Sequence, residues 1–249
     1  MKVNFLKKFI EKILPILFWV FVWQIIFIIV NNSKLIPSPL STFFSFKEVI
    51  FEYDFLSVIF LSTFRVLCAF ILGMILGLSF AVLSKKFKVI YYLLNPILLG
   101  IRIIPVPSFI LLLMVWLNPD FVTIVISFLM VFPLVFSNLF EGFDNVDHSL
   151  LEMAKVYNLS KKDIIKNIYV PSMMSSFFSS CKNGIGFAFK AGVSAEIMAS
   201  LVSSVGHKIA ESKINHHIEH LFGWTIIIIL IGLTLEKIIL KIALYLSVK

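Results

Sequence analysis

Residues 56–83 read LSVIFLSTFRVLCAFILGMILGLSFAVL, an apolar run that contains one charged side chain, Arg65. A helix crosses the hydrocarbon core of a bilayer with about 20 consecutive apolar residues, so this run is long enough to span a membrane. Five further segments share its character, at about 9–30, 89–117, 121–140, 173–203 and 221–246. The sequence therefore predicts an all-α, polytopic membrane helical bundle with about six transmembrane helices, formed by residues 1–249 as one domain.

Two of these segments are longer than a span requires, and each contains residues that bend helices. Pro96, Pro105 and Pro107 lie in 89–117, and Gly184 and Gly186 lie in 173–203. Proline removes a helical hydrogen bond, and glycine weakens a helix interior. We therefore expect both segments to bend.

Composition supports the same class of protein. Hydrophobic residues make up 59% of the chain and charged residues 14%, with a mean hydropathy of +1.00. Soluble domains average about 45–50% apolar and about 25% charged residues, so lipid must solvate much of this surface. The net charge of +8 does not indicate nucleic-acid binding, because the lysines form short clusters between the apolar runs.

The lysine clusters predict the orientation of the chain. Fourteen lysines fall on the side of the termini and the 141–171 loop, whereas four fall on the other side: Lys34, Lys47, Lys208 and Lys213. Cytoplasmic connections are enriched in Lys and Arg. We therefore expect a multi-pass protein of the inner or plasma membrane with both termini in the cytoplasm.

The connection 141–171 is the one sizeable hydrophilic segment, and it predicts two short helices. Ser149-x-x-Glu152 has the pattern of a capping box, which predicts a helix over about 150–157. Asn158 tolerates the left-handed conformation and can end that helix. Ser160-x-x-Asp163 predicts a second helix over about 161–169, and Pro171 suits the first turn of the fifth span. Such a hairpin serves either as a structural element against the spans or as a docking element for a cytosolic partner.

This loop resembles the EAA loop of permeases from binding-protein-dependent ABC importers. That motif is Glu-Ala-Ala, three residues, Gly, nine residues and Ile-x-Leu-Pro. This chain has Glu152-Met153-Ala154, then Asn158, then Ile168-Tyr169-Val170-Pro171 at the same spacing. Shorter pieces resemble the nitrate/sulfonate/taurine branch, which includes carriers of pyrimidine precursors: Ile36-Pro37-Ser38-Pro39, Ser62–Gly77, Arg102-x-x-Pro105 and Ser194-Ala195-Glu196.

The resemblance implies the type I ABC importer permease fold and a set of partners. These are ATP-binding cassette ATPase subunits, a second permease copy, most simply as a homodimer, and an extracytoplasmic solute-binding protein. The chain has no Gly-x-x-x-x-Gly-Lys-Ser/Thr run, so we expect it to carry no cofactor and the partner subunit to bind ATP. The residues implied in ATPase coupling are Glu152, Met153, Ala154, Asn158, Ile168 and Pro171.

Charged residues within the spans mark a candidate translocation path. Charge inside a bilayer is costly, and such residues usually face a bundle interior or a wet cavity. Arg65 and four candidate path residues, Arg102, Lys182, Lys190 and Glu196, lie in the predicted spans. Glu196 could pair with Lys190, Arg102 or Arg65. The excess of cations favours an anionic or strongly polar solute. The small residues of 173–203 fit a pore wall or close helix packing equally well.

Other functions find less support in the sequence. No nucleophile and base are arranged for catalysis, so we expect a transport subunit and not an enzyme. His216, His217 and His220 lie in the last external loop, where we expect no metal site and assign them no role. A secondary transporter driven by an ion gradient is the alternative function, but it predicts internal repeats that this chain does not show. The sequence predicts an ATP-driven permease for a small polar solute, similar to nitrate, sulfonate or taurine carriers.

Overall fold

The computed structural model describes residues 2–247, with the side chains of residue 11 and of residues 13–245, so Lys249 lies outside the described residues. Every regular element within this range is helical. In chain order these are α1 (Lys2–Val30), α2 (Pro39–Ile50), α3 (Phe55–Lys86), α4 (Lys88–Ile103), α5 (Val106–Leu113), α6 (Pro119–Asp144), α7 (His148–Val156), α8 (Lys161–Ile164), the π-helical turn η1 (Ile165–Tyr169), α9 (Val170–Met198), α10 (Val205–Ile214) and α11 (Ile218–Ser247).

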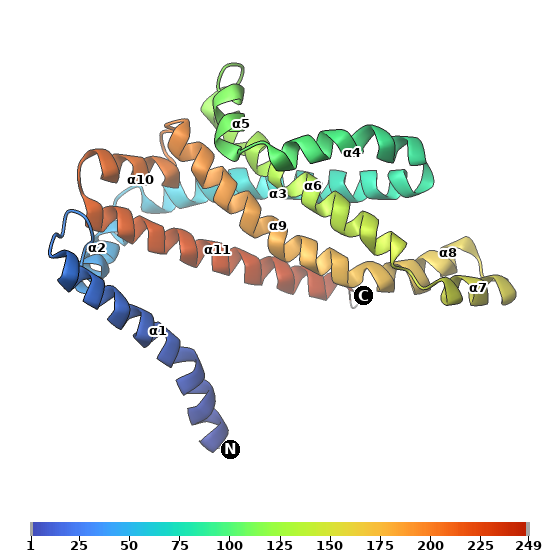
Figure 1. Ribbon diagram of the computed structural model, residues 1–249, viewed down its shortest axis with the longest axis horizontal. Coiled ribbons are helices and arrows are strands. Elements are labelled where there is room, and N and C mark those ends of the chain that lie inside the picture. The colour runs from blue at the N-terminus through green and yellow to red at the C-terminus, as the bar shows by residue number, and fades with distance from the viewer. Residues whose placement is uncertain (1, 248–249) are drawn as a thin grey trace.

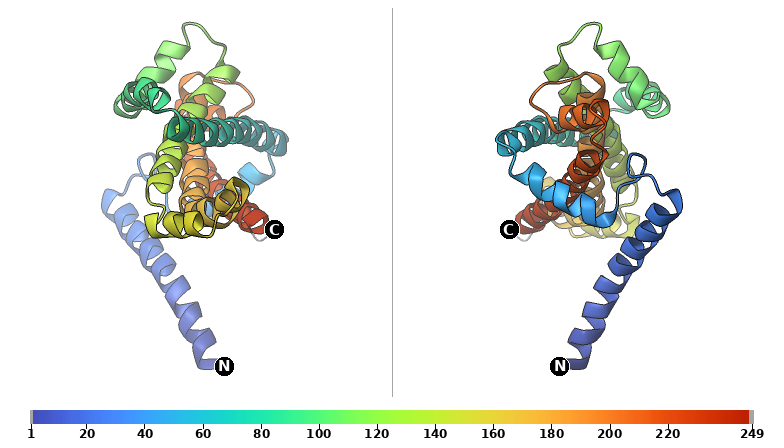
Figure 2. Two further views of the ribbon diagram at one scale, coloured as in Figure 1. Left: turned by 90° about the vertical axis from the view of Figure 1, so that its right-hand side faces the viewer. Right: turned by 90° about the vertical axis from the view of Figure 1, so that its left-hand side faces the viewer.

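The long helices α3, α6, α9 and α11 form the body of the molecule, and α1 projects away from it (Figure 1). The α7–α8 hairpin lies at one end of this body, while α2, α5 and α10 lie toward the other (Figure 1). Views along the long axis show α3, α6, α9 and α11 grouped together, with α1 apart (Figure 2). The predicted all-α class is confirmed.

The core lies where α3, α6 and α9 meet, and it consists of apolar side chains from all three helices. Val66 and Phe70 of α3 pack with Val131 and Val135 of α6 and with Ile185 of α9. A Cβ atom at Gly77 would lie 2.7 Å from the Val135 side chain. The absence of a side chain at this position therefore lets α3 and α6 approach closely, as small residues do in membrane bundles.

The third predicted span is broken more sharply than expected. The segment divides into α4 and α5, and the helix direction turns by 102° between them. Ile104, between them, is extended (φ −68°, ψ 127°), because a residue before proline is driven out of the helical region. Pro96 lies inside α4 and does not end it.

The fifth predicted span shows the opposite outcome. Gly184 and Gly186 do not interrupt α9, and the helix ends at Met198 instead of continuing to residue 203. Gly184 is buried, and a Cβ atom there would lie 3.2 Å from the Phe70 ring. Its small size thus serves helix packing, and the helix continues without a break at this position.

Three helices, α1, α3 and α6, are long and apolar enough to cross a membrane, or four segments if the bent α4–α5 pair is one span. Lys182, Lys190 and Glu196 lower the hydropathy of α9. A count of about six spans stays a prediction, although the described helices follow the predicted segments closely.

Candidate functional site

The hairpin between α6 and α9 is built by local capping interactions. Helix α7 begins two residues earlier than the capping-box prediction placed it, because its N-cap is Asp147 and not Ser149. The Asp147 carboxylate accepts a hydrogen bond from the Ser149 backbone N–H at 2.8 Å. This bond is the main reason that the pKa of Asp147 lies below its usual value. The predicted Ser149–Glu152 box is therefore wrong in register.

The end of α7 confirms the role predicted for Asn158. Asn158 has a positive φ of 51°, in the left-handed region. The Leu159 N–H donates to the Ala154 carbonyl at 2.9 Å, and the Asn158 N–H donates to the Lys155 carbonyl at 3.1 Å. These two bonds form a Schellman motif, in which asparagine takes the position that glycine usually occupies.

The second loop helix begins as predicted. Ser160 is its N-cap and accepts a hydrogen bond from the Asp163 N–H at 3.2 Å, while the Ser160 hydroxyl donates to the Asp163 carboxylate at 2.6 Å. This helix does not end before the fifth span. Residues 161–198 form one continuous rod through α8, η1 and α9, and Pro171 lies in the first turn of α9.

The two loop helices pack on each other through a small apolar cluster. Ala154 of α7 and Ile168 of η1 are buried in it, together with Val146. Other side chains of the hairpin are open: Met153 is 47% exposed, and Glu152 is exposed beside it. We call the exposed apolar surface of the hairpin the hairpin face; its residues are Leu150, Met153, Val156, Tyr157 and Ile165.

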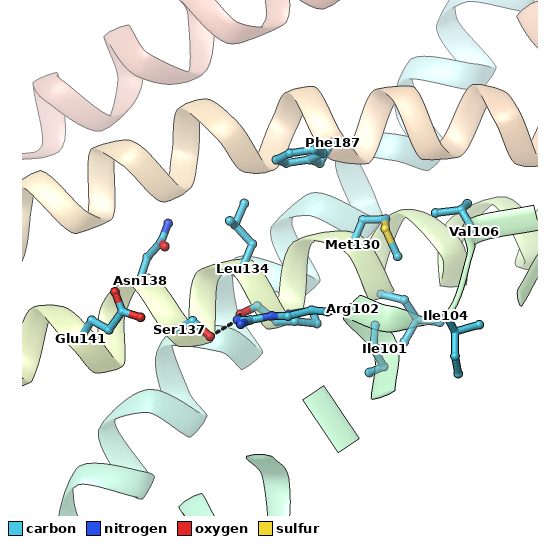
Figure 3. A pocket seen from close by; sticks show the side chains of 12 residues that line it. Ile101, Arg102, Ile104, Val106, Met130, Leu134, Ser137, Asn138, Glu141 and Phe187 are labelled. Atoms are coloured by element: carbon cyan, nitrogen blue, oxygen red, sulfur yellow. Dashed lines mark hydrogen bonds between the residues drawn. The ribbon is translucent and has the colours of Figure 1, made fainter. Parts of the chain in front are cut away.

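A cavity of about 450 Å³ lies between α4, α6 and α9 and contains Arg102 (Figure 3). The guanidinium of Arg102 donates to the Pro133 carbonyl at 2.9 Å and also to the Ser137 hydroxyl. Asn138 and Glu141 of α6 and Phe187 of α9 line the same space (Figure 3). The cavity therefore combines apolar walls with one cation and several hydrogen-bonding groups.

Comparison with known proteins places this geometry in a family. Residues 69–246 match the family described as binding-protein-dependent transport system inner membrane component. The chain belongs to this family. The match begins within α3 and covers α4 to α10, the Arg102 cavity and the whole hairpin, so the chain is a multi-pass membrane permease subunit of a binding-protein-dependent ABC importer and not an enzyme itself. This membership also decides against the alternative of a secondary transporter.

Three relatives of this chain are themselves named as transport or import permeases. It is 28% identical over 85% of its length to a Bacillus subtilis protein described as an aliphatic sulfonates transport permease, SsuC, covering 77% of that protein. It is 25% identical over 78% of its length to the nitrate import permease NrtB of Synechococcus elongatus, covering 73% of it. It is 24% identical over 94% of its length to the bicarbonate transport permease CmpB of the same organism, covering 90% of it.

The other candidate path residues of the permease lie apart from Arg102. Lys182 is 3.7 Å from Glu236 of α11, and Lys190 is exposed. Neither lines the Arg102 cavity. Glu196 is 0% exposed, and the cation beside it is Arg65, at 3.7 Å. Arg65 is therefore the partner among the three that the sequence left open.

Sequence reasoning missed the carboxylates that balance the intramembrane cations. Asp120, in the first turn of α6, binds Arg65 at 2.7 Å, and Glu236 faces Lys182. The expected excess of cations is thus smaller than counted, because Arg65 and Lys182 have acidic partners. Within the described residues, no ion pair is found for Arg102 or Lys190. Asp120 lies at the start of α6, one residue before the predicted span 121–140, so it was not counted among the charges within the spans.

Of the three histidines near the start of α11, His220 faces carboxylates at and just after the end of α2. His220 lies 3.3 Å from a Glu48 carboxylate oxygen and 3.9 Å from one of Glu52. In the part of the chain that the structure describes, no group of three His, Cys, Asp or Glu side chains is placed to hold a metal ion.

Proposed function

We propose that this permease moves a small oxyanion across the membrane and that a separate ATPase drives it through the α7–α8 hairpin. The observation that carries this proposal is the hairpin itself. It presents an exposed apolar face at one end of the molecule, and its second helix continues without a break into α9. A partner bound to this face would displace α9 directly.

The hairpin face has the composition of a docking surface. Met153 and Tyr157 are large, half-exposed or more exposed side chains without a partner element covering them, and Glu152 adds a charge between them. Interface cores are enriched in Met and aromatic residues. The buried residues of the EAA loop, Ala154 and Ile168, shape the hairpin from inside. In this proposal ATP is bound and hydrolysed on the docked ATPase subunit.

The oxyanion substrate is inferred from the cavity and from the names of the relatives. Sulfonate, nitrate and bicarbonate are anions whose charge is spread over several oxygens. Arg102 presents planar guanidinium donors of the kind that match such groups, and Ser137 and Asn138 lie beside it. Within the described residues, no carboxylate lies within ion-pair distance of Arg102, so its charge is available to a solute.

A complete transporter requires further components. We propose that a second copy of the permease covers the open side of the Arg102 cavity and that an extracytoplasmic binding protein delivers the solute. The distribution of lysines supports a cytoplasmic position for the termini and the hairpin in this proposal.

Uptake by the complete transporter tests the substrate proposal. Arg102→Gln removes the charge and is expected to lower uptake of nitrate, bicarbonate or an alkanesulfonate by about tenfold or more, in keeping with the loss of a charged hydrogen bond. Arg102→Lys is expected to recover uptake only partly, because it lacks the planar fork. Lys182→Gln is the matched control and should transport normally, since Lys182 faces Glu236 instead of the cavity. Normal uptake by Arg102→Gln would refute a role for Arg102 in the path.

A further inference from the structure

The start of α10 is held by side chains from two other helices. Glu196 of α9 accepts a hydrogen bond from the Gly206 N–H at 3.1 Å. Ser62 of α3 accepts one from the Val205 N–H at 3.0 Å and donates its own proton to Glu196 at 2.9 Å. Glu196, Ser62 and Val205 are all 0% exposed. Two N–H groups at the α10 N-terminus are therefore bound by α9 and α3, in a region closed to solvent.

Local capping satisfies only part of the α10 N-terminus. The Ser204 hydroxyl accepts a hydrogen bond from the His207 N–H at 3.0 Å, whereas the N–H groups of Val205 and Gly206 depend on Ser62 and Glu196. A buried carboxylate is also a costly way to satisfy backbone groups. One oxygen of Glu196 and one nitrogen of Arg65 are buried without a hydrogen-bond partner. The Glu196–Ser62 link thus completes the cap of α10 with side chains from two other helices, and in doing so it joins α3, α9 and α10.

The backbones of α9 and α10 also touch directly at this joint. A Cβ atom at Gly206 would lie 2.4 Å from the Glu196 Cβ and 2.7 Å from the Ile197 backbone nitrogen. Such distances leave no room for independent sliding of the two helices. In its first turn α10 is also tethered by Lys208, which binds Asp54 at 2.8 Å and Glu52 at 3.0 Å. Burial alone would lower the pKa of Lys208, but these two bonds outweigh it and raise the pKa.

The same α9 helix extends from the hairpin to this joint. Residues 161–198 are continuous, and Glu196 lies two residues from the end. At 1.5 Å per residue the helical path is about 57 Å long, more than the roughly 40–45 Å of a whole bilayer. One unbroken helical segment therefore connects the hairpin with the start of α10.

We propose that Glu196 and Ser62 are positioning residues that make α10 follow the coupling hairpin, so that the ATPase acts on the extracytoplasmic surface through α9. This inference rests on the proposed docking of the ATPase at the hairpin. Packed elements move as units, so displacement of the rod at one end reaches its other end. The Glu196–Ser62 link passes this displacement to α10, and α10 forms part of the surface beside the outer end of the permease.

Hydrogen exchange in the assembled permease–ATPase complex tests the inference. The complex is placed in lipid nanodiscs and compared without nucleotide and with ATP and vanadate. We expect nucleotide to change exchange at both the hairpin (148–169) and α10 (204–214). In Ser62→Ala the change at α10 should fall by about fivefold or more, which is the lower end of typical coupling between sites, while the change at the hairpin remains. A purely structural role would loosen α10 equally with and without nucleotide.

Matched variants separate the link from general destabilisation. Ser84→Ala is the control, because Ser84 is also in α3 and 1% exposed but has no hydrogen-bond partner. It should keep both changes. Glu196→Gln retains an oxygen acceptor and should preserve most of the α10 response, whereas Glu196→Leu should lose this response. Glu196→Leu therefore tests the link even where Ser62→Ala does not assemble into the complex.

Two results would overturn the inference, and they differ from failure of the proposed function. A wild-type complex that responds at the hairpin but not at α10 would contradict it. So would an undiminished α10 response in Ser62→Ala and Glu196→Leu. A wild-type complex without any response at the hairpin would instead refute the proposed docking, and the inference with it.

Discussion

Two neighbouring residues of α7 should fail in different ways when each is replaced by arginine. Ala154 is 0% exposed and packs inside the hairpin, whereas Met153 is 47% exposed on the hairpin face. Ala154→Arg should open the hairpin in the permease alone. Met153→Arg should leave the hairpin intact and weaken only the attachment of the ATPase. The two variants share the introduced charge and lie one residue apart, so each is the control for the other.

The size of the Ala154 effect follows from the cluster that it belongs to. An arginine cannot be enclosed there without an acidic partner, so the hairpin opens instead. Opening exposes the buried side chains of Val146 and Ile168. Full burial of one such side chain contributes about 1.5–3 kcal/mol, so the loss is about 3–6 kcal/mol as an upper estimate. Met153→Arg changes an exposed position and should alter the free energy of unfolding by less than about 0.5 kcal/mol.

Two measurements on each variant distinguish these outcomes. Hydrogen exchange of residues 148–169 in the permease alone should rise sharply for Ala154→Arg and stay at the wild-type level for Met153→Arg. Co-purification with the ATPase should fall for both. For Met153→Arg the loss should be about 30-fold in affinity, which corresponds to about 2 kcal/mol at an interface hot spot. Wild-type exchange in Ala154→Arg would refute the packing argument, and wild-type affinity in Met153→Arg would refute the docking face.

Three further predictions concern packing, acid sensitivity and orientation. Gly77→Ala should destabilise the protein by about 1–3 kcal/mol in thermal unfolding, because the new Cβ would lie 2.7 Å from the Val135 side chain. Gly100→Ala is the control: a Cβ there would have no neighbour within 4 Å beyond its own stretch of helix, so this variant should be neutral or stabilised by up to about 1 kcal/mol. Equal shifts in the two variants would contradict the close α3–α6 contact. The pKa of Asp147 is lowered in the folded protein, so its carboxylate stabilises α7 above the unfolded pKa of about 4, and this contribution is lost as pH falls through the folded pKa. Hydrogen exchange of α7 should therefore rise below about pH 4 in the wild type. The Asp147→Asn variant should show no such step. Reporter fusions after residue 249 and near Lys213 should report opposite sides of the membrane, and the same side for both would show that the six-span model is wrong.

Hydropathy located the helices of this permease well because each long helix must bury its backbone hydrogen bonds in lipid. The segment 56–83 became α3 (Phe55–Lys86), and 121–140 became α6 (Pro119–Asp144). Hydropathy could not predict the 102° break between α4 and α5, because the angle between the two helices depends on where each finds packing partners. The presence of Gly184 predicted a bend, but in the structure the Phe70 ring lies against this position and the small residue leaves room for it.

The site was predictable where the chemistry is local. Asn158 and Ser160 act through groups within five residues, so their roles followed from residue type and spacing. Ala154 and Met153 are adjacent and both apolar, and only the fold of the hairpin decides which one is enclosed. Glu196 was the hardest case. Its partners Ser62 and Arg65 lie more than 130 residues away in the chain, and no spacing rule joins them.

The continuity of the rod across Pro171 has a physical basis in the turn that precedes it. A proline has no N–H, and inside a regular helix its ring collides with the carbonyl four residues earlier. Here the preceding turn, Ile165–Tyr169, is π-helical, and the Val170 N–H donates to the Ile165 carbonyl five residues back. The wider turn adds one residue before the proline, and the Ser172 hydroxyl donates to the Ile168 carbonyl at 2.7 Å. π-Turns inside helices often mark functional positions. In this permease the π-turn lets Pro171 be accommodated within the rod, so that α8 and α9 remain one helical segment; under the proposed docking, the pull of an ATPase would then not cross a break in the helix.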